Sequence, residues 1–355
     1  MRFSVKIELI HMAIEQFLRP DNVFIIAEAG VNHNGDFDLA KSLVRAAAGA
    51  GADAVKFQSF KAERLVTRAA PKADYQKISD GARSQYDMLK ALELSDEAVS
   101  ALKDEAKRFG LIFMSTPFDE IAATWLDRLG VQVFKIGSGD LTNLPLLALV
   151  AGFNKPMIIS TGMAAEGEID EALAAVRSAG NPDIILLHCV SAYPADPKDA
   201  NLRAIQTMKD RFNLPVGFSD HTPGIAVSIA AAALGACVIE KHLTVDKDLP
   251  GPDHRASLDP DEFKALVEGL RIVTAALGSG KKEPTPAERK IAQTVRKSVV
   301  AQAAIPKGAL ITAEMVTLKR PAGGIPPKDI SKVIGAVAAR DIGDDEVITW
   351  DDIRR

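Results

Sequence analysis

Short apolar segments rich in strand-forming residues recur eight times in this chain, and segments with a helical pattern separate them. The eight segments are residues 23–29, 53–60, 111–116, 133–139, 156–161, 184–190, 216–220 and 236–243. Amphipathic helices are predicted at 37–52, 95–110 and 168–180, each reaching a glycine at or near its end. Strands that alternate with helices form parallel sheets. Eight such units predict an α/β fold, a (β/α)8 TIM barrel, in preference to an open doubly wound sheet.

The chain is longer than a barrel alone requires. It has 355 residues, of which 47% are apolar, so a barrel of about 250 residues leaves room for a further module. A segment rich in glycine, proline and charge, GSGKKEPTPAERK, follows Leu277 and is typical of a linker. The predicted organisation is an N-terminal extension at 1–20, a catalytic barrel at 21–280, a linker at 281–295 and a small domain at 296–355.

The small C-terminal domain contains an internal repeat. IPKGALITAEMV at 305–316 aligns with IGDDEVITWDDI at 342–353, with isoleucine, threonine and acidic residues in register. A domain of this size has little core of its own, so we expect it to dock on its own barrel or on a partner subunit.

Charge and cysteine content exclude several classes of protein. The formal net charge is -4, which argues against a nucleic-acid partner, and an anionic substrate would require a local cluster of lysine and arginine. Cys189 and Cys237 both lie in apolar segments, so no disulfide framework is predicted and a cytoplasmic location is favoured. Residues 1–20 do not resemble a signal peptide, and no apolar run is long enough to cross a membrane.

Polar residues stand at or near the carboxyl end of each predicted strand, where barrel enzymes place their active sites. In chain order they are Glu28, Asn32, His33, Lys56, Gln58, Ser115, Thr116, Lys135, Ser138, Ser160, Thr161, His188, His221, Glu240 and His242. We expect the chemistry of the protein to lie among these residues.

Two histidines end the seventh and eighth strands. His221 and His242 would be neighbours about 4.8 Å apart, so their imidazoles could share a metal ion. Strand alternation places Glu240 on the same face as His242, as a ligand or as an acceptor for bound water. Such a donor set suits Mn²⁺, Fe²⁺, Co²⁺ or Zn²⁺ better than Ca²⁺. The alternative is a structural role, which we assign to His188.

Lys56 and Lys135 lie within segments that otherwise bury completely, so each must meet an anion or a carboxylate. The alternative to a bound anion is an internal ion pair with Glu28. The hydroxyls of Thr116, Ser138 and Ser160, with the glycine loop GSGD, suit a phosphate group. A long segment between the second and third strands, with KAERLVTRAAPKADYQK and SQYDMLKALEL, is predicted to border the same site.

Several ordered motifs carry a family likeness: AEAGVNHNG, VKFQSFKAERL, STPFD, FKIGSGD, ISTGM, LLHC followed by YP, GFSDHT, EKH and PGPDH. In this order they resemble the sialic acid synthases and their relatives that make legionaminic and pseudaminic acids. The likeness runs from about Val23 to the last residues, because the C-terminal domain resembles the antifreeze-like (SAF) domain of that family.

The resemblance implies condensation of phosphoenolpyruvate with an N-acyl-mannosamine-type sugar, release of phosphate, and a divalent metal, Mn²⁺ or Mg²⁺. It implies that His221 and His242 are the metal ligands, that Glu28 lies at the reacting atoms, and that Glu240 or Glu28 assists the addition of water. The implied phosphoenolpyruvate ligands are Lys56, Thr116, Lys135, Ser138 and Ser160, and the implied sugar contacts are Gln58, Asp140, Tyr193 and Asp253. Arg320 would reach the barrel of the partner in a domain-swapped homodimer.

The sequence departs from the family pattern at three positions. Phe57 stands where some sialic acid synthases have histidine, Asp140 where glutamate is common, and Ser191 where some members have asparagine. Residue 57 favours a legionaminate-type or animal-type enzyme, and the other two leave the sugar open. The alternatives are another metal-dependent phosphoenolpyruvate aldolase of the deoxy-heptulosonate type and a non-catalytic carbohydrate-binding protein.

Overall fold

The chain folds into two compact units that divide after Gly278. The computed structural model describes Leu18 and residues 22–72, 84–181 and 183–354. Of the N-terminal extension expected at 1–20, only Leu18 is therefore described, and part of the long insertion, including ADYQK of KADYQK, lies outside the described residues.

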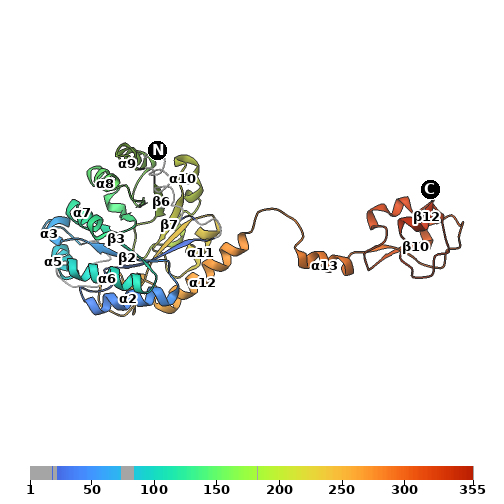
Figure 1. Ribbon diagram of the computed structural model, residues 1–355, viewed down its shortest axis with the longest axis horizontal. Coiled ribbons are helices and arrows are strands. Elements are labelled where there is room, and N and C mark those ends of the chain that lie inside the picture. The colour runs from blue at the N-terminus through green and yellow to red at the C-terminus, as the bar shows by residue number, and fades with distance from the viewer. Residues whose placement is uncertain (1–17, 19–21, 73–83, 182, 355) are drawn as a thin grey trace, which may run out of the picture. The chain divides into compact units, whose positions relative to one another are not determined.

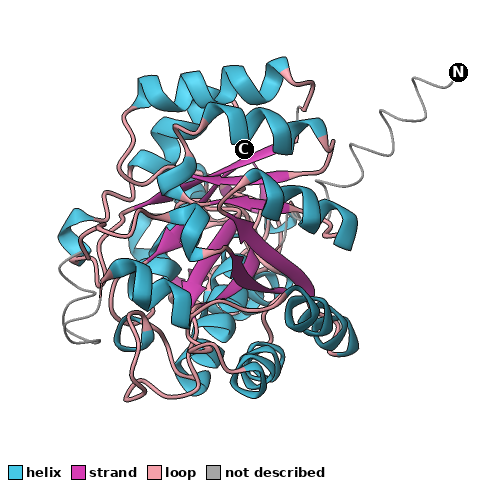
Figure 2. Cartoon of the chain, turned by 90° about the vertical axis from the view of Figure 1, so that its left-hand side faces the viewer, coloured by secondary structure: helices cyan, strands magenta, loops and turns pink. Residues whose placement is uncertain are grey.

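The first unit is the predicted barrel. Its eight strands form one parallel sheet in the order β3-β2-β1-β8-β7-β6-β5-β4, and β3 and β4 lie side by side where the sheet closes. The strands occupy the centre of the unit with helices around them (Figures 1 and 2). They are β1 (Phe24–Gly30), β2 (Ala54–Ser59), β3 (Ile112–Pro117), β4 (Phe134–Ile136), β5 (Met157–Ser160), β6 (Ile184–Cys189), β7 (Val216–Asp220) and β8 (Val238–His242).

Helices cover the outside of the sheet, and their ends follow the capping signals of the sequence. The helix α2 begins after Asp36, whose carboxylate accepts from the backbone N–H groups of Asp38 and Leu39, and it ends at Gly51, where φ is 84°. Among the described residues, no helix has the length and apolarity that a membrane span needs. The helices of this unit are α2 (Phe37–Ala50), α3 (Ala62–Leu65), α5 (Gln85–Ala91), α6 (Asp96–Arg108), α7 (Glu120–Leu129), α8 (Leu144–Gly152), α9 (Glu166–Ser178), α10 (Ala204–Phe212), α11 (Ala226–Ala233) and α12 (Pro260–Leu277).

Strand alternation separates two apolar cores. Alternate strand residues such as Ile25 and Val55 pack against the helices. The residues between them that point inward, such as Ile26 and Ala54, fill the barrel. The interior is narrow at Gly217 on β7, because a Cβ atom there would lie 2.5 Å from the carbonyl oxygen of Val238. Along β1, β2 and β8 the inward residues change from apolar to Glu28, Lys56, Glu240 and His242 toward the carboxyl ends. The barrel is therefore plugged by apolar side chains below and open to a polar site above.

The second unit begins with a helix inside the predicted linker. The helix α13 (Pro286–Val295) starts at a capping box in which Thr285 and Glu288 bond to each other's backbone N–H groups. Two antiparallel pairs follow, β9 (Ser298–Ala301) with β10 (Val316–Lys319) and β11 (Val337–Ala338) with β12 (Ile353–Arg354).

The internal repeat of the second unit is also structural. Ile305 and Ile342, which align in the repeat, pair with each other in an antiparallel bridge. The aligned Thr312 and Thr349 each precede a short 3-10 turn that leads directly into a strand, β10 in one copy and β12 in the other. The two copies thus have the same local fold and share one small core.

Candidate active site

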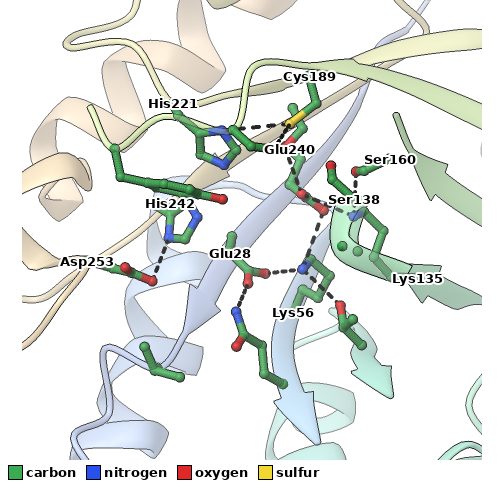
Figure 3. Close-up of a pocket in the computed structure, with 18 of the residues that line it drawn as sticks. Glu28, Lys56, Lys135, Ser138, Ser160, Cys189, His221, Glu240, His242 and Asp253 are labelled. Atoms are coloured by element: carbon green, nitrogen blue, oxygen red, sulfur yellow. Dashed lines mark hydrogen bonds and ion pairs between the residues drawn. The ribbon is translucent and has the colours of Figure 1, made fainter. Parts of the chain in front are cut away.

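A cavity of about 390 Å³ opens at the carboxyl ends of the strands, where the sequence places its polar residues. Residues from all eight strands or the loops that follow them reach it (Figure 3). It is lined by Glu28, Lys56, Gln58, Thr116, Lys135, Ser138, Ser160, Tyr193, His221, Glu240, His242 and Asp253, all expected from the sequence, together with Cys189, Ser191 and Ser219 among others.

Two buried lysines form the positive part of the cavity. The Nζ atom of Lys56 lies 2.6 Å from Oε2 of Glu28 and 3.7 Å from Oε2 of Glu240, and it donates to Oγ1 of Thr116 at 3.2 Å. Lys135 donates to Oγ of Ser160 at 2.7 Å and lies 3.6 Å from Oε1 of Glu240. The ion pair between Lys56 and Glu28, expected as the alternative to anion binding, is therefore present.

The two carboxylates in this cluster differ in proton affinity. Burial would raise the pKa of Glu240, but Lys135 and Lys56 lower it to about 2, helped by the hydroxyl of Ser219, which donates to Oε1 at 3.0 Å. Burial raises the pKa of Glu28 despite Lys56, and the nearby negative charge of Glu240 adds to this rise. Glu240 is therefore a permanent anion, and Glu28 is the carboxylate suited to carry a proton.

The lysines respond differently to the same surroundings. Burial lowers the pKa of Lys135, and Lys56 adds to the effect. Burial would also lower the pKa of Lys56, but the carboxylates of Glu240 and Glu28 outweigh it and raise the pKa. An incoming anion would therefore find one firmly charged ammonium group and a second whose charge it would itself stabilise.

His221 and His242 face one another across the cavity, with ring centroids 5.3 Å apart. Nδ1 of His221 lies 2.9 Å from the carbonyl oxygen of Val190, so it is the protonated nitrogen and Nε2 is left toward the cavity. Burial holds the pKa of His242 well below its usual value, so this imidazole is neutral. Its Nδ1 lies 3.7 Å from Oδ2 of Asp253, and burial raises the pKa of that carboxyl to about 6.

These two imidazoles fit a divalent ion in part. Nδ1 of His242 is buried without a hydrogen bond, which is costly for a polar atom unless a ligand reaches it. Within the described ranges, however, no group of three histidine, cysteine, aspartate or glutamate residues is placed to hold a metal. A metal here would have two protein ligands, and its remaining positions would be open to water or substrate.

Cys189 is a residue of the site that the sequence argument missed. Its thiol lies 3.8 Å from Nδ1 of His221 and 4.0 Å from Oγ of Ser191. Burial would raise the pKa of Cys189, but the contact with His221 lowers it. Burial would lower the pKa of His221, but the contact with Cys189 and the hydrogen bond to the carbonyl of Val190 raise it. The sequence does contain a signal for this position. Leu187 points into the barrel, and Cys189, two residues further along the same strand, must point the same way.

Gly162 allows three loops to meet at this point. Its N–H donates to Oγ of Ser138 at 3.0 Å, and a Cβ atom would lie 2.2 Å from Oγ of Ser191 and 2.8 Å from Oγ of Ser138. A side chain at this position would require both serine hydroxyls to move. The glycine of ISTGM therefore allows the loops after β4, β5 and β6 to approach closely.

One wall of the cavity is apolar. Met88 of α5 and Leu92, which follows the helix, pack with Val31 in a small cluster, and Leu89 and Phe118 lie against it. The described part of the long insertion thus borders the site, as expected from the sequence. The cavity is therefore lined both by the charged lysine cluster and by apolar side chains.

Four residues expected near the strand ends are buried but do not line the cavity: Asn32, His33, Ser115 and Thr161. Three further predicted residues also lie elsewhere. Asp140 is beside the cavity but is not part of its lining, and its Oδ1 accepts from Nδ2 of Asn143 at 3.3 Å. His188 points to the helical layer, where Nε2 lies 2.8 Å from the carbonyl oxygen of Ala200, as expected for a structural histidine. Arg320 is exposed at the end of β10 in the second unit.

Fold and site together define a class of protein, a (β/α)8 barrel with a buried lysine cluster beside a pair of imidazoles. The model of the NeuB family matches residues 43–282, and the model of the SAF domain matches residues 296–354. The chain belongs to the NeuB family, which confirms the expected relationship.

Named relatives cover nearly the whole chain. An N,N'-diacetyllegionaminic acid synthase of Legionella pneumophila is 49% identical over 335 residues, 93% of this chain and 94% of that protein. The synthase of the same name from Campylobacter jejuni is 49% identical over 327 residues, 91% of this chain and 98% of that protein. The crystal structure of N-acetylneuraminic acid synthetase from Leptospira borgpetersenii, in complex with citrate, has a TM-score of 0.68 at 38% identity and covers 76% of this chain and 90% of that one.

Proposed function

We propose that this protein condenses phosphoenolpyruvate with an open-chain N-acyl-mannosamine-type sugar, giving a nine-carbon 2-keto acid and inorganic phosphate. The observation that carries the proposal is the lysine cluster. Lys56 and Lys135 are buried with hydroxyl partners at the carboxyl ends of β2 and β4, where a carboxylate and a phosphate group of one small molecule would bind. The names of the two relatives at 49% identity support the same reaction.

The reaction needs one carbon–carbon bond and one carbon–oxygen cleavage. Atom C3 of phosphoenolpyruvate attacks the sugar aldehyde, C2 becomes electron-poor, and water adds to C2. Phosphate then leaves with the bridging oxygen. Glu28 is the group suited to take the proton of the attacking water, because its raised pKa lies nearer to neutral than that of Glu240. Lys56 and Lys135 stabilise the phosphate as it departs.

Glu240 serves a different purpose. Its carboxylate lies within ion-pair distance of both lysines and accepts from Ser219, so it stays ionised and holds the two ammonium groups in place. Its negative charge would also stabilise the positive charge that develops on C2 of the substrate. The two carboxylates thus divide the work between charge and proton transfer.

We propose that the reaction depends on a divalent metal, Mn²⁺ or Mg²⁺, held by His221 and His242. When bound, the ion supplies a Lewis acid for the sugar aldehyde. The support is the neutral His242 with its unsatisfied buried Nδ1 and the tautomer of His221 that leaves Nε2 toward the cavity.

We propose the diacetamido-trideoxy sugar that leads to legionaminate as the preferred substrate, with N-acetylmannosamine as the alternative. The apolar wall formed by Met88, Leu89 and Leu92 supports this choice, since it suits the methyl groups of acyl and deoxy positions better than hydroxyls. Gln58, Tyr193 and Asp253 remain the proposed polar sugar contacts, and Asp140 is proposed to act only from beside the cavity.

We also propose a domain-swapped homodimer in which Arg320 reaches the barrel of the partner. The support is its exposure and the family match of its domain: among the described residues no carboxylate forms an ion pair with Arg320.

We propose a cytoplasmic location as well. Cys189 and Cys237 are both free thiols, which is compatible with a reducing cytoplasm.

The proposal is tested by phosphate release. Purified protein should release phosphate from phosphoenolpyruvate only when an acyl-mannosamine-type sugar is present. Excess chelator should stop the release, and Mn²⁺ should restore it. Full activity in excess chelator would contradict the metal site, and sugar-independent release would contradict the condensation.

A further inference from the structure

A fully buried ion pair lies directly behind the two imidazoles. Asp220 ends β7 and Lys241 is the residue before His242 on β8, and the two residues stand opposite each other in the strand register. Nζ of Lys241 donates to Oδ2 of Asp220 at 2.9 Å, and both side chains are 0% exposed. Because strand neighbours alternate, this pair faces the helical layer while Glu240 and His242 face the cavity.

The carboxylate of Asp220 is saturated with donors. Oδ1 accepts from the backbone N–H of Thr222 at 2.8 Å and from its Oγ1 at 2.7 Å, and Oδ2 also accepts from Oγ of Ser228 on α11 at 2.5 Å. Lys241 donates in addition to the carbonyl oxygen of Thr222. The pair therefore ties both sides of the turn that contains His221 to the strand that carries His242.

Stability alone does not account for such a pair. Removing two charges from water is costly, and a well-packed apolar pair of the same volume is often as stable or more stable. What an apolar pair cannot do is bond to the N–H, hydroxyl and carbonyl of Thr222. These directional bonds fix the backbone on both sides of His221, which follows the last residue of β7.

We propose that Asp220 and Lys241 are positioning residues that set the separation of the His221 and His242 imidazoles for binding one divalent ion. The inference rests on the proposed metal site and adds to it two residues that touch neither metal nor substrate. Residues that orient metal ligands from behind typically contribute about 10-fold to 100-fold in metal affinity.

The test measures Mn²⁺ binding without substrates, by the electron paramagnetic resonance signal of free Mn²⁺. Asp220→Asn and Lys241→Met each leave an unpaired buried group and should lower the melting temperature. The double variant removes both charges and should recover much of that stability. It should nevertheless bind Mn²⁺ at least 10-fold more weakly than the wild type.

A matched control comes from the other end of the barrel. Asp53 forms an ion pair with Arg271 at 2.9 Å near the start of β2, away from the imidazoles. Asp53→Asn should lower the melting temperature and leave the Mn²⁺ affinity unchanged. Ser228→Ala is a milder second variant, which loses one hydrogen bond to Asp220 and should weaken Mn²⁺ binding about threefold.

The outcomes separate this inference from the proposed function. A folded double variant with wild-type Mn²⁺ affinity overturns the positioning role while the metal site stands. If the double variant does not fold, unchanged affinity in folded Ser228→Ala overturns it. A wild-type protein that binds no Mn²⁺ but makes product overturns the metal site and the inference together, and leaves the condensation intact.

Discussion

Lys56 and Glu28 form an ion pair in which Nζ and Oε2 are 2.6 Å apart, with both side chains almost completely buried. Glu240 lies on the other side of the same ammonium group, at 3.7 Å. One lysine is thus shared between a carboxylate that holds its charge and a carboxylate whose pKa is raised. An anionic substrate that draws Lys56 away from Glu28 would raise the proton affinity of Glu28 further.

Glu28→Gln should lower kcat about 100-fold or more, because an amide cannot take up the proton of water. The melting temperature should change little, since Lys56 keeps its ion pair with Glu240 and the amide can still bond to Gln58 and Lys56. Steady-state kinetics of phosphate release measure the effect.

The matched control for Glu28 is Glu105→Gln. Glu105 is also buried and is paired with Arg45 at 3.0 Å and Arg108 at 2.6 Å, on α6 outside the barrel. This variant should lose stability and keep its kcat. Equal losses of kcat in both variants would mean that Glu28 acts through stability and not through chemistry.

His221→Ala and His242→Ala should each abolish turnover while the melting temperature stays close to that of the wild type. The reason is that both residues lie at strand ends, where side chains serve the site more than the core. His188→Gln is the control, because His188 faces the helical layer. A large loss of thermal stability in the first two variants would identify them as structural histidines.

The burial of His33 leads us to expect that the folded protein loses stability in mild acid. It follows β1 and is buried, with Nδ1 accepting from the N–H of Gly35 at 3.0 Å. Burial lowers the pKa of His33 from 6.5 to about 4. As pH falls below 6.5, the unfolded chain takes up a proton that the folded state does not, so stability present above pH 6.5 is lost toward pH 4. The shift corresponds to roughly 3 kcal/mol over this window.

The measurement is the melting temperature between pH 7.5 and pH 4.5. His33→Gln keeps an acceptor for Gly35 but cannot be protonated, so its melting temperature should fall less with pH than that of the wild type. Parallel curves for the two proteins would mean that His33 is not the group that titrates.

Arg320→Ala should raise the KM for the sugar about 10-fold or more without weakening phosphoenolpyruvate binding, if Arg320 completes the partner's site. Lys319→Ala is the neighbouring control, since Lys319 pairs with Asp345 within its own domain. Unfolding and refolding Arg320→Ala together with Glu28→Ala should restore part of the activity in mixed dimers. If mixed dimers form but show no activity, Arg320 acts within its own chain or has no role in the active site.

The barrel could be predicted because its signals are local. Each buried strand is a short apolar run, and helix ends such as Asp36 and Gly51 are encoded within one turn. The inward polar residues could be predicted because side chains alternate along a strand, so Glu240 and His242, two residues apart, point the same way. The helix α13 also has a local signal, the capping box from Thr285 to Glu288. The surrounding proline and charged residues are typical of a linker and obscure this signal.

Other features depend on contacts between distant segments. The bond between Ser219 and Glu240 and the pair of Asp220 with Lys241 arise from the register of β7 and β8, which no single segment specifies. Cys189 is inward by parity, yet its approach to His221 depends on the loops after β6 and β7. The apolar wall of α5 depends on how a long insertion folds back over the strands.

The most direct test of the central claim is mass spectrometry of the products formed from phosphoenolpyruvate and a panel of sugars in the presence of Mn²⁺. The panel should include 2,4-diacetamido-2,4,6-trideoxymannose, N-acetylmannosamine, its 6-phosphate and, for the deoxy-heptulosonate alternative, erythrose 4-phosphate. We predict a nine-carbon 2-keto acid from the diacetamido sugar, one phosphate released for each product formed, and slower turnover of N-acetylmannosamine. Product from erythrose 4-phosphate alone, or no consumption of phosphoenolpyruvate with any sugar, would contradict the account.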